Sequence, residues 1–483
     1  MQECGPIEHV GTTVPRIRRR MLRTIGLGLL VTVAVVAGIF LITSWLAEDR
    51  LQKKLAELDA SDPGWRWDDI IAAREELPDD QNSAVRVQNV VQMFPGNMNE
   101  KKIQNIFEKR ESGRFLTANQ HEVFKTELEK ARQALNEARK LKDQPKGHHT
   151  IAWSRVPIMT MFGQVQNARE VASILSYDVV LCCQEKDFDG ALDSCRAILN
   201  CGRSLGSEPS FIIALVRFAI EAITINRIQA TLALGEPSDA ALLACQRLLE
   251  DEESLEIMYR AMRGERAMAD RTLECVQSGE ITRAQLVKGT LGKTGQTNIG
   301  GLTLEDIAAT FLVGSVPRSR VASLELMTEL LEASKLPEAE RKAKTKEFEQ
   351  KIRKMPFMAM QLAPAGMKVL DAEQRTKAQL RTTIAALAAE RFRKAKKRWP
   401  ETLEELVPEF LAKIPADPYD SKPLRYLKPA DGIVIYSVGP NLVDDQGNLG
   451  TGVGRNEDIG CRLWNVAERG RPPLPEEPAD VPQ

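Results

Sequence analysis

Four side chains that can bind a cation through oxygen stand near the C-terminus: Asn441, Asp444, Asp445 and Asp458. Calcium takes about six to eight oxygen ligands and accepts carboxylates mixed with backbone carbonyls. We expect Val438 to donate the carbonyl, and the five glycines between 439 and 454 allow the backbone to turn tightly. The pattern predicts a Ca²⁺ site in this loop. The same residues also fit an acidic turn between two strands that binds no metal.

Catalytic motifs are otherwise missing from the sequence. The segment 289–294, GTLGKT, lacks the first glycine of a phosphate-binding loop, because Val287 stands in that position. No Gly-x-Ser-x-Gly or His-Glu-x-x-His motif occurs. Adjacent His148 and His149 have no cysteine or carboxylate at ligand spacing, so we expect an exposed polar loop there. We therefore predict a non-enzymatic protein with no catalytic residues and no cofactor besides the candidate Ca²⁺.

The cysteines favour packing over chemistry. Six of them fall in a helical block, mostly on apolar faces, which is typical of small buried side chains. A disulfide between Cys183 and Cys195 is the alternative, because the two would meet across a helical hairpin. Seven cysteines follow residue 47: Cys182, Cys183, Cys195, Cys201, Cys245, Cys275 and Cys461.

An uncharged, apolar stretch at 24–47 predicts where the protein is held. As a helix it would be about 36 Å long, enough to cross a hydrocarbon core of about 30 Å. Basic residues precede the stretch and acidic residues follow it, which places 1–23 in the cytoplasm and the bulk of the chain on the periplasmic side. A cleaved signal peptide is the alternative, but its apolar core is usually shorter. The flanking charges are Arg16, Arg18, Arg19, Arg20 and Arg23, then Glu48 and Asp49.

Most of the remaining chain has helical periodicity. We expect a juxtamembrane helical region over 48–157 and a helical-hairpin domain over 158–398. Thr117 to Gln120 fits a capping box that opens one long helix, and residues 165–250 predict two helical hairpins in series. Further helices are expected at 254–279, 303–313, 318–335, 338–354 and 366–397, with a Gly/Thr-rich loop at 288–301. The proline-rich, acidic segment 467–483 predicts a disordered tail.

Overall composition excludes other classes of protein. The 483 residues are 43% apolar and 28% charged, as in a globular protein, so collagen-like and wholly disordered chains are excluded. The formal net charge is −1, which gives no electrostatic reason to expect a nucleic-acid partner.

A different pattern begins at Trp399. Thr402 to Glu405 fits a second capping box, IPADPY follows at 414–419, and GIVIYSVG at 432–439 reads as a strand before the acidic loop. In this order the segment resembles the C-terminal sheet and calcium loop of the major pseudopilin of type II secretion. With an N-terminal anchor and a helical middle, the whole chain also resembles a group of planctomycete single-pass membrane proteins. The resemblance implies a small α+β module with a short antiparallel sheet at 399–466.

The sequence departs from the pseudopilin pattern at several positions. Residues 22–27 lack the prepilin-peptidase site and the glutamate that follows it, so processing and assembly as a pilin are not expected. Tyr419 and Asp420 stand where the pseudopilin has an aromatic residue and a glycine. Asn441 replaces a ligand aspartate, which weakens the case for calcium.

These features predict a mainly α protein anchored in the lipid bilayer through 24–47. Its helical scaffold would bind a protein partner in the cell envelope. One alternative is an accessory component of a type II secretion or pilus-like apparatus. The other is a membrane-anchored hydrolase without a recognisable motif. A cleft with convergent polar groups of perturbed pKa would favour the hydrolase.

Overall fold

The computed structural model describes most of the chain and has a mainly helical fold. A three-stranded antiparallel sheet lies near the C-terminus, as predicted. The described residues are 16–74, 76–110, 113–286, 298–299, 302–303, 315–336, 357–450 and 457–473, together with 340, 341, 344, 347, 350 and 351. The predicted helix at 303–313 lies almost wholly outside them, and the one at 338–354 lies mostly outside them.

The helices mostly begin and end near their predicted bounds. They are α1 (Arg16–Ser61), α2 (Trp67–Ala72), α3 (Ser83–Gln92), α4 (Glu100–Lys109), α5 (Ala118–Lys130), α6 (Arg132–Arg139), α7 (Gly163–Gln184), α8 (Phe188–Arg203), α9 (Phe211–Leu234), α10 (Asp239–Glu253), α11 (Ile257–Gln277), α14 (Val316–Ser334) and α16 (Phe357–Lys396). Short 3₁₀ helices are η1 (Lys140–Asp143), η2 (Pro157–Met159), η3 (Leu403–Leu406) and η4 (Val466–Glu468). The strands are β1 (Asn298–Ile299), β2 (Leu302–Thr303), β3 (Arg425–Leu427), β4 (Gly432–Ser437) and β5 (Ile459–Trp464).

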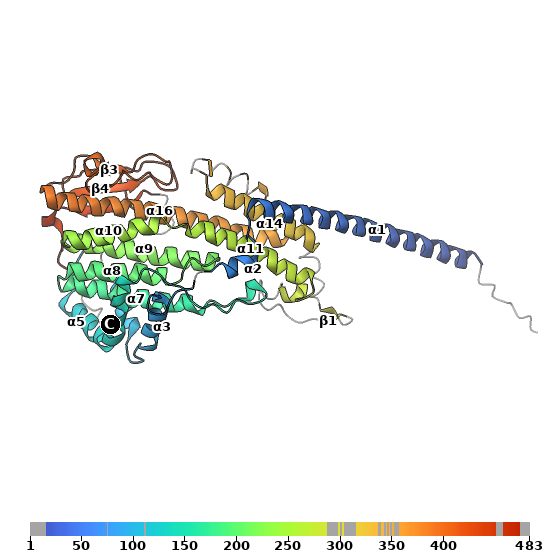
Figure 1. The fold of residues 1–483 in the computed structure, drawn as a ribbon, viewed down its shortest axis with the longest axis horizontal. Helices are drawn as coiled ribbons and strands as arrows, with labels where there is room; N and C mark the ends of the chain where they lie inside the picture. Colours follow the sequence, from blue (N-terminus) through green and yellow to red (C-terminus); the bar gives the residue numbers. More distant parts are fainter. Residues whose placement is uncertain are drawn as a thin grey trace, which may run out of the picture.

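Helix α1 is one continuous helix that reaches from outside the body into it (Figure 1). Its last part is buried: Leu51, Leu55 and Leu58 pack with Trp65 and with Leu324 of α14. The helix ends at Ser61, and the turn-forming residues Asp62-Pro63-Gly64 follow it.

The earlier part of α1 carries exposed apolar side chains. Val31, Val35, Ile39, Ile42 and Trp45 are each between 54% and 68% exposed. Among the described side chains, no helix has an apolar stretch long enough to cross a membrane. Several side chains of the predicted span 24–47 lie outside that description.

The body is built around one long helix, α16. Helices α9 and α10 pack against α16, α8 packs against α9, and α7 packs against α8 (Figure 1). The sheet also packs against α16 through β4 and β5. A single hydrophobic core therefore runs from Val87 in α3 to Leu463 in β5, and residues 399–466 share it with the helices.

The sheet follows the predicted strand pattern. Strand β4 lies between β3 and β5, with Ile433 opposite Leu463 and Ile435 opposite Cys461. All six residues of β4 are buried, whereas burial alternates along β5. A central strand with both faces covered reads as an apolar run, so GIVIYS was recognisable from the sequence.

Several local predictions are confirmed. Thr117 and Gln120 form the capping box of α5. Apolar residues of the helical block at 165–250 are buried, including Leu175 in α7 and Ile198 in α8. The first hairpin forms between α7 and α8, and Asp187 caps α8 by accepting a hydrogen bond from the Gly190 N–H at 2.9 Å.

Other predictions are wrong. The long helix expected after Thr117 is divided at Ala131 into α5 and α6. The second expected hairpin does not form as a packed pair, because α10 packs against α16 and α8. Thr402 makes no side-chain cap, and the element that follows it is the 3₁₀ helix η3.

The cysteines form no disulfide among the described residues. All seven cysteines after residue 47 are free and buried. Cys183 donates its thiol to Thr231 at 3.5 Å, so the proposed bridge between Cys183 and Cys195 is wrong.

The predicted disordered tail is also wrong for its first seven residues, 467–473. Arg469 donates to both carboxylate oxygens of Glu390 in α16, at 3.0 and 2.8 Å. The side chain of Glu390 is 0% exposed and that of Arg469 is 2% exposed. Arg393 also donates to Glu390, at 2.6 Å. A buried carboxylate needs such partners, and this requirement holds the segment in place. Residues 474–483 lie outside the described part of the chain.

We expect Arg469→Ala to lower the free energy of unfolding by about 3 kcal/mol, because it leaves Glu390 buried with one of its two cationic partners removed. Urea unfolding of the full chain in detergent would measure this change. Arg462→Ala is the matched control, because the side chains of Arg462 and Asp431 are 35% and 39% exposed and their ion pair should contribute about 1 kcal/mol or less. Equal effects of the two substitutions would contradict the role given to Arg469.

Candidate functional site

The predicted calcium ligands lie in the loop between β4 and β5, where their side chains form hydrogen bonds within the protein. Asn441 donates its side-chain N–H to Asp445 at 2.9 Å and accepts the Val443 N–H at 3.0 Å. Asp444 accepts the Tyr436 hydroxyl at 2.9 Å. These bonds are typical of an Asx turn, the metal-free alternative.

Asp458 is the buried member of the predicted set, with 3% of its surface exposed. It accepts the backbone N–H groups of Asp445 at 3.3 Å and Gly447 at 2.8 Å. Burial raises the pKa of Asp458, and the carboxylates of Asp444 and Asp445 raise it further.

Val438, the expected carbonyl donor, is buried at the end of β4, and its N–H donates to Asp417 at 2.9 Å. In the part of the chain that the structure describes, no three acidic, histidine or cysteine side chains converge as a metal site would require. Residues 451–456 of the same loop lie outside the description. The calcium site stays a prediction.

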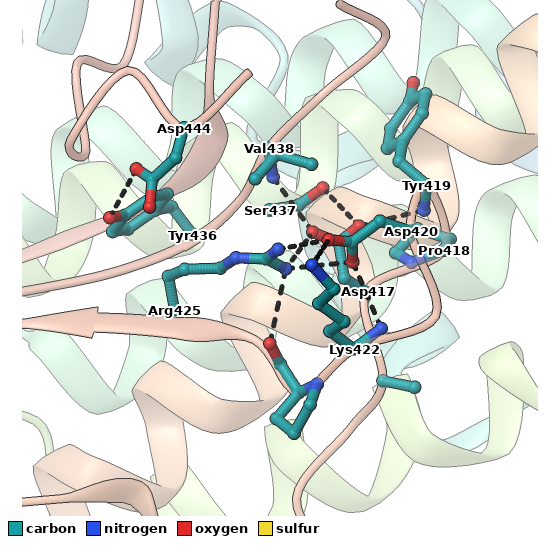
Figure 2. Close-up of polar contacts among 12 residues, drawn as sticks. Asp417, Pro418, Tyr419, Asp420, Lys422, Arg425, Tyr436, Ser437, Val438 and Asp444 are labelled. Carbon is teal, nitrogen blue, oxygen red and sulfur yellow. Dashed lines mark hydrogen bonds and ion pairs between the residues drawn. The ribbon is translucent and has the colours of Figure 1, made fainter. Parts of the chain in front are cut away.

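Asp417 organises this end of the molecule (Figure 2). Its carboxylate accepts the backbone N–H groups of Tyr419 and Val438, both at 2.9 Å, and the hydroxyl of Ser437 at 2.8 Å. Arg425 donates to it at 2.8 Å and also contacts Asp420. Because every oxygen of this buried carboxylate is engaged, Asp417 joins the turn at 414–419 to the end of β4, and a structural role accounts for it.

A cavity of about 830 Å³ in the helical body is the strongest candidate for a functional site. Its walls come from the end of α2, the loops at 145–148 and 206–209, and the ends of α8, α9, α10 and α11. Two glycines allow these loops to approach closely. A Cβ at Gly147 would stand 2.4 Å from the Ser204 Cα, and one at Gly264 would stand 2.4 Å from the Pro209 Cα.

One wall of the cavity is an ion pair between Arg74 and Glu208. Arg74 donates to the two oxygens of Glu208 at 2.9 and 2.7 Å. It also lies 3.2 Å from Nε2 of His148, and a guanidinium only donates, so Nε2 accepts and Nδ1 carries the proton. His148 Nδ1 lies 3.2 Å from Glu208. Burial raises the pKa of Glu208, and the hydrogen bonds from Arg74 oppose this shift.

A buried cluster of four residues adjoins the cavity: Arg203 and Arg217 line it, and Glu221 and Glu252 are their buried neighbours. Glu252 accepts from Arg217 at 2.6 Å and also pairs with Arg203. Although burial acts to raise it, the two arginines and a hydrogen bond from Glu221 lower the pKa of Glu252 to about 2.

The pKa of Glu221 is shifted in the opposite direction. Burial and the neighbouring carboxylate of Glu252 raise the pKa of Glu221 well above its ordinary value. The neutral form of Glu221 is therefore favoured, with Glu221 donating to Glu252, and the two arginines share the Glu252 carboxylate. These side chains were missed in the sequence. Arg217 and Glu221 stand four residues apart on α9, a spacing that ordinarily indicates an exposed helical ion pair.

His149 next to the cavity is buried, so the prediction of an exposed polar loop is wrong for this residue. It is 2% exposed, and neither ring nitrogen has a hydrogen-bond partner among the described residues. Burial, with a contribution from His148, lowers the pKa of His149 to about 4. The imidazole is thus neutral near pH 7.

Comparisons with known proteins give no relative: no family model, curated protein or solved structure matches the chain. The likeness to the pseudopilin end module stays a prediction from the order of its motifs.

We expect Glu252→Gln to destabilise the protein by about 3–5 kcal/mol, because it leaves Arg203 and Arg217 buried without a carboxylate. Glu221→Gln should change the free energy of unfolding by about 1 kcal/mol or less. A neutral amide there replaces a neutral acid and can still donate to Glu252. Urea unfolding at pH 7 measures both substitutions. A loss for Glu221→Gln as large as that for Glu252→Gln would show that Glu221 is ionised.

Because of His149, the protein should become less stable as the pH is lowered. Its pKa is about 4 in the folded protein and about 6.5 in the unfolded chain, so the unfolded chain binds the extra proton between these values. The contribution of neutral His149 is complete above about pH 6.5 and is lost as the pH falls to 4, by roughly 3 kcal/mol. His149→Leu should reduce the slope of unfolding free energy against pH in this window. An unchanged slope would contradict the burial of a neutral imidazole.

Proposed function

We propose that this protein is a non-enzymatic, single-pass membrane protein whose helical body is held on the periplasmic side and binds a protein partner in the cell envelope. The observation that carries the proposal is the continuity of α1. Its exposed apolar side chains precede the body, and Leu51, Leu55 and Leu58 of the same helix are buried within it. An apolar surface of this kind on a projecting helix needs a non-aqueous partner, and a bilayer fits its length.

The orientation rests on charge. The arginines before residue 24 favour the cytoplasm, and Glu48 and Asp49 begin the outer part. Because α1 continues without a break from Arg16 to Ser61, the body would be fixed to the anchor rather than tethered by a linker.

A non-enzymatic role is supported by the state of the thiols. Burial raises the pKa of every cysteine after residue 47, so these thiols are protonated and enclosed rather than poised as nucleophiles. In the module at 399–466, the order of helix, Asp417 turn, strands and acidic loop is compatible with a pseudopilin-like end. We propose that this module stiffens the scaffold, because it shares the hydrophobic core of the helices.

We expect the full chain to remain in the membrane pellet after alkaline carbonate extraction. The double substitution Val35→Asp and Ile39→Asp should release it, because each aspartate at mid-span opposes insertion by about 2.5–3.5 kcal/mol. Gln52→Asp is the matched control, since Gln52 is an exposed polar residue of the same helix. Release of the unsubstituted chain by carbonate would refute the anchor.

The same proposal predicts the topology. An alkaline phosphatase fused after Val481 should be active in intact cells, because this enzyme folds only outside the cytoplasm. Activity of a cytoplasm-dependent reporter at that position would reverse the orientation.

A further inference from the structure

The wall of the cavity between α8, α9 and α10 carries more positive than negative charge. Arg203 and Arg217 are buried, with side chains 8% and 3% exposed, and Glu252 is the one ionised carboxylate that they share. The neighbouring Glu221 has a raised pKa, because burial and the Glu252 carboxylate disfavour its ionised form. Two buried guanidinium groups therefore share one carboxylate of low pKa.

The rest of the cavity does not remove this excess. Six basic side chains line it: Arg74, Lys146, Arg203, Arg217, Arg260 and Arg263. Three carboxylates line it: Glu208, Asp251 and Glu256. Glu252 pairs with Arg203 and Arg217 without lining the cavity, and Asp62 pairs with both Arg263 and Arg266. Among the described residues that line the cavity, basic side chains outnumber carboxylates, and such a lining favours a bound anion.

Donors for such an anion are available at the cavity. Nη1 of Arg203 has no hydrogen-bond partner in the described structure, although the other two guanidinium nitrogens of Arg203 bind Glu252 and the Leu248 carbonyl. Lys146 and Arg260 line the cavity with exposed side chains, and neither forms an ion pair with a described residue. Arginine and lysine donors converging on one site are the usual receptors for phosphate groups.

The size of the cavity excludes a bare ion as the natural occupant. A volume of about 830 Å³ lies in the range of small-molecule sites, about 300–1,000 Å³. Ile70, Leu77, Leu255 and Tyr259 give it an apolar wall beside the basic one. A molecule that carries an anionic group and a larger organic remainder matches both sets of side chains.

We propose that this cavity binds a phosphodiester, held through Arg203, Arg260 and Lys146 within the field of Arg217. A phosphodiester combines an anionic group for the basic side chains with organic substituents for the apolar ones. The source is either a soluble phosphodiester or the headgroup of a phospholipid.

The test uses the full chain in dodecyl maltoside micelles, which contain no phosphate, with glycerophosphoglycerol as the soluble probe and calorimetric titration as the readout. We expect saturable binding. Arg260→Gln and Lys146→Gln should each weaken it about tenfold, because each removes a charge-assisted hydrogen bond. Arg247→Gln is the matched control: it removes the same charge from an exposed position on α10 that does not line the cavity. Its affinity should equal that of the unsubstituted chain.

A second arm identifies the source. Adding phosphatidylglycerol to the micelles should raise the melting temperature and block glycerophosphoglycerol if the lipid itself enters. An unchanged titration assigns the site to the soluble ligand, and both results support a phosphodiester site. Absence of binding at 10 mM probe by the folded protein would overturn the proposal. Equal weakening by Arg247→Gln, or equal binding of acetate, would also overturn it. None of these outcomes depends on the membrane anchor.

Discussion

Helix α16 has to bury opposite sides along most of its length, and the arrangement of the body follows from this constraint. One side packs on α9 and α10, and β4 and β5 cover another. A helix of 40 residues with so much covered surface carries polar groups that cannot reach water. Glu390 is the clearest case, and the structure supplies Arg393 from the same helix and Arg469 from beyond the sheet. The C-terminal segment is thereby fixed to the centre of the molecule.

Buried carboxylates act in the same way elsewhere. Asp178 in α7 accepts from Arg139, which ends α6, and from Ser194 in α8. Asp270 in α11 accepts from Arg320 in α14 at 2.8 and 2.9 Å. Such pairs contribute little net stability over apolar packing, but removing one partner is costly, so they favour one pairing of helices over others. We infer that they specify how helices of similar amphipathicity are arranged.

The cavity adjoins one of these buried charge clusters, in which the carboxyl groups differ in pKa. At Glu390 two arginines meet one carboxylate beside the half-exposed Glu236, which compensates Arg393. At Glu252 the second carboxyl group, Glu221, is driven to its neutral form by burial and by Glu252 itself. Arg203 and Arg217 of this second cluster also line a cavity large enough for a small molecule, which is why the anion site is proposed there.

The sequence by itself determined the local elements. Helical periodicity, the Thr117 capping box and the apolar run at 432–437 depend on residues within one or two turns of one another, so they were readable without the fold. It also placed an apolar, uncharged stretch at 24–47 and the acidic residues of one loop. Tertiary structure alone decided which distant groups meet. Arg74 with Glu208, Arg203 with Glu252 and Glu390 with Arg469 are 134, 49 and 79 residues apart. No local pattern encodes such distances, because the packing of the helices brings these side chains together. The same packing buries His149 and leaves Cys183 unpaired, and it turns a pair of glutamates on α9 and α10 into one neutral acid and one anion.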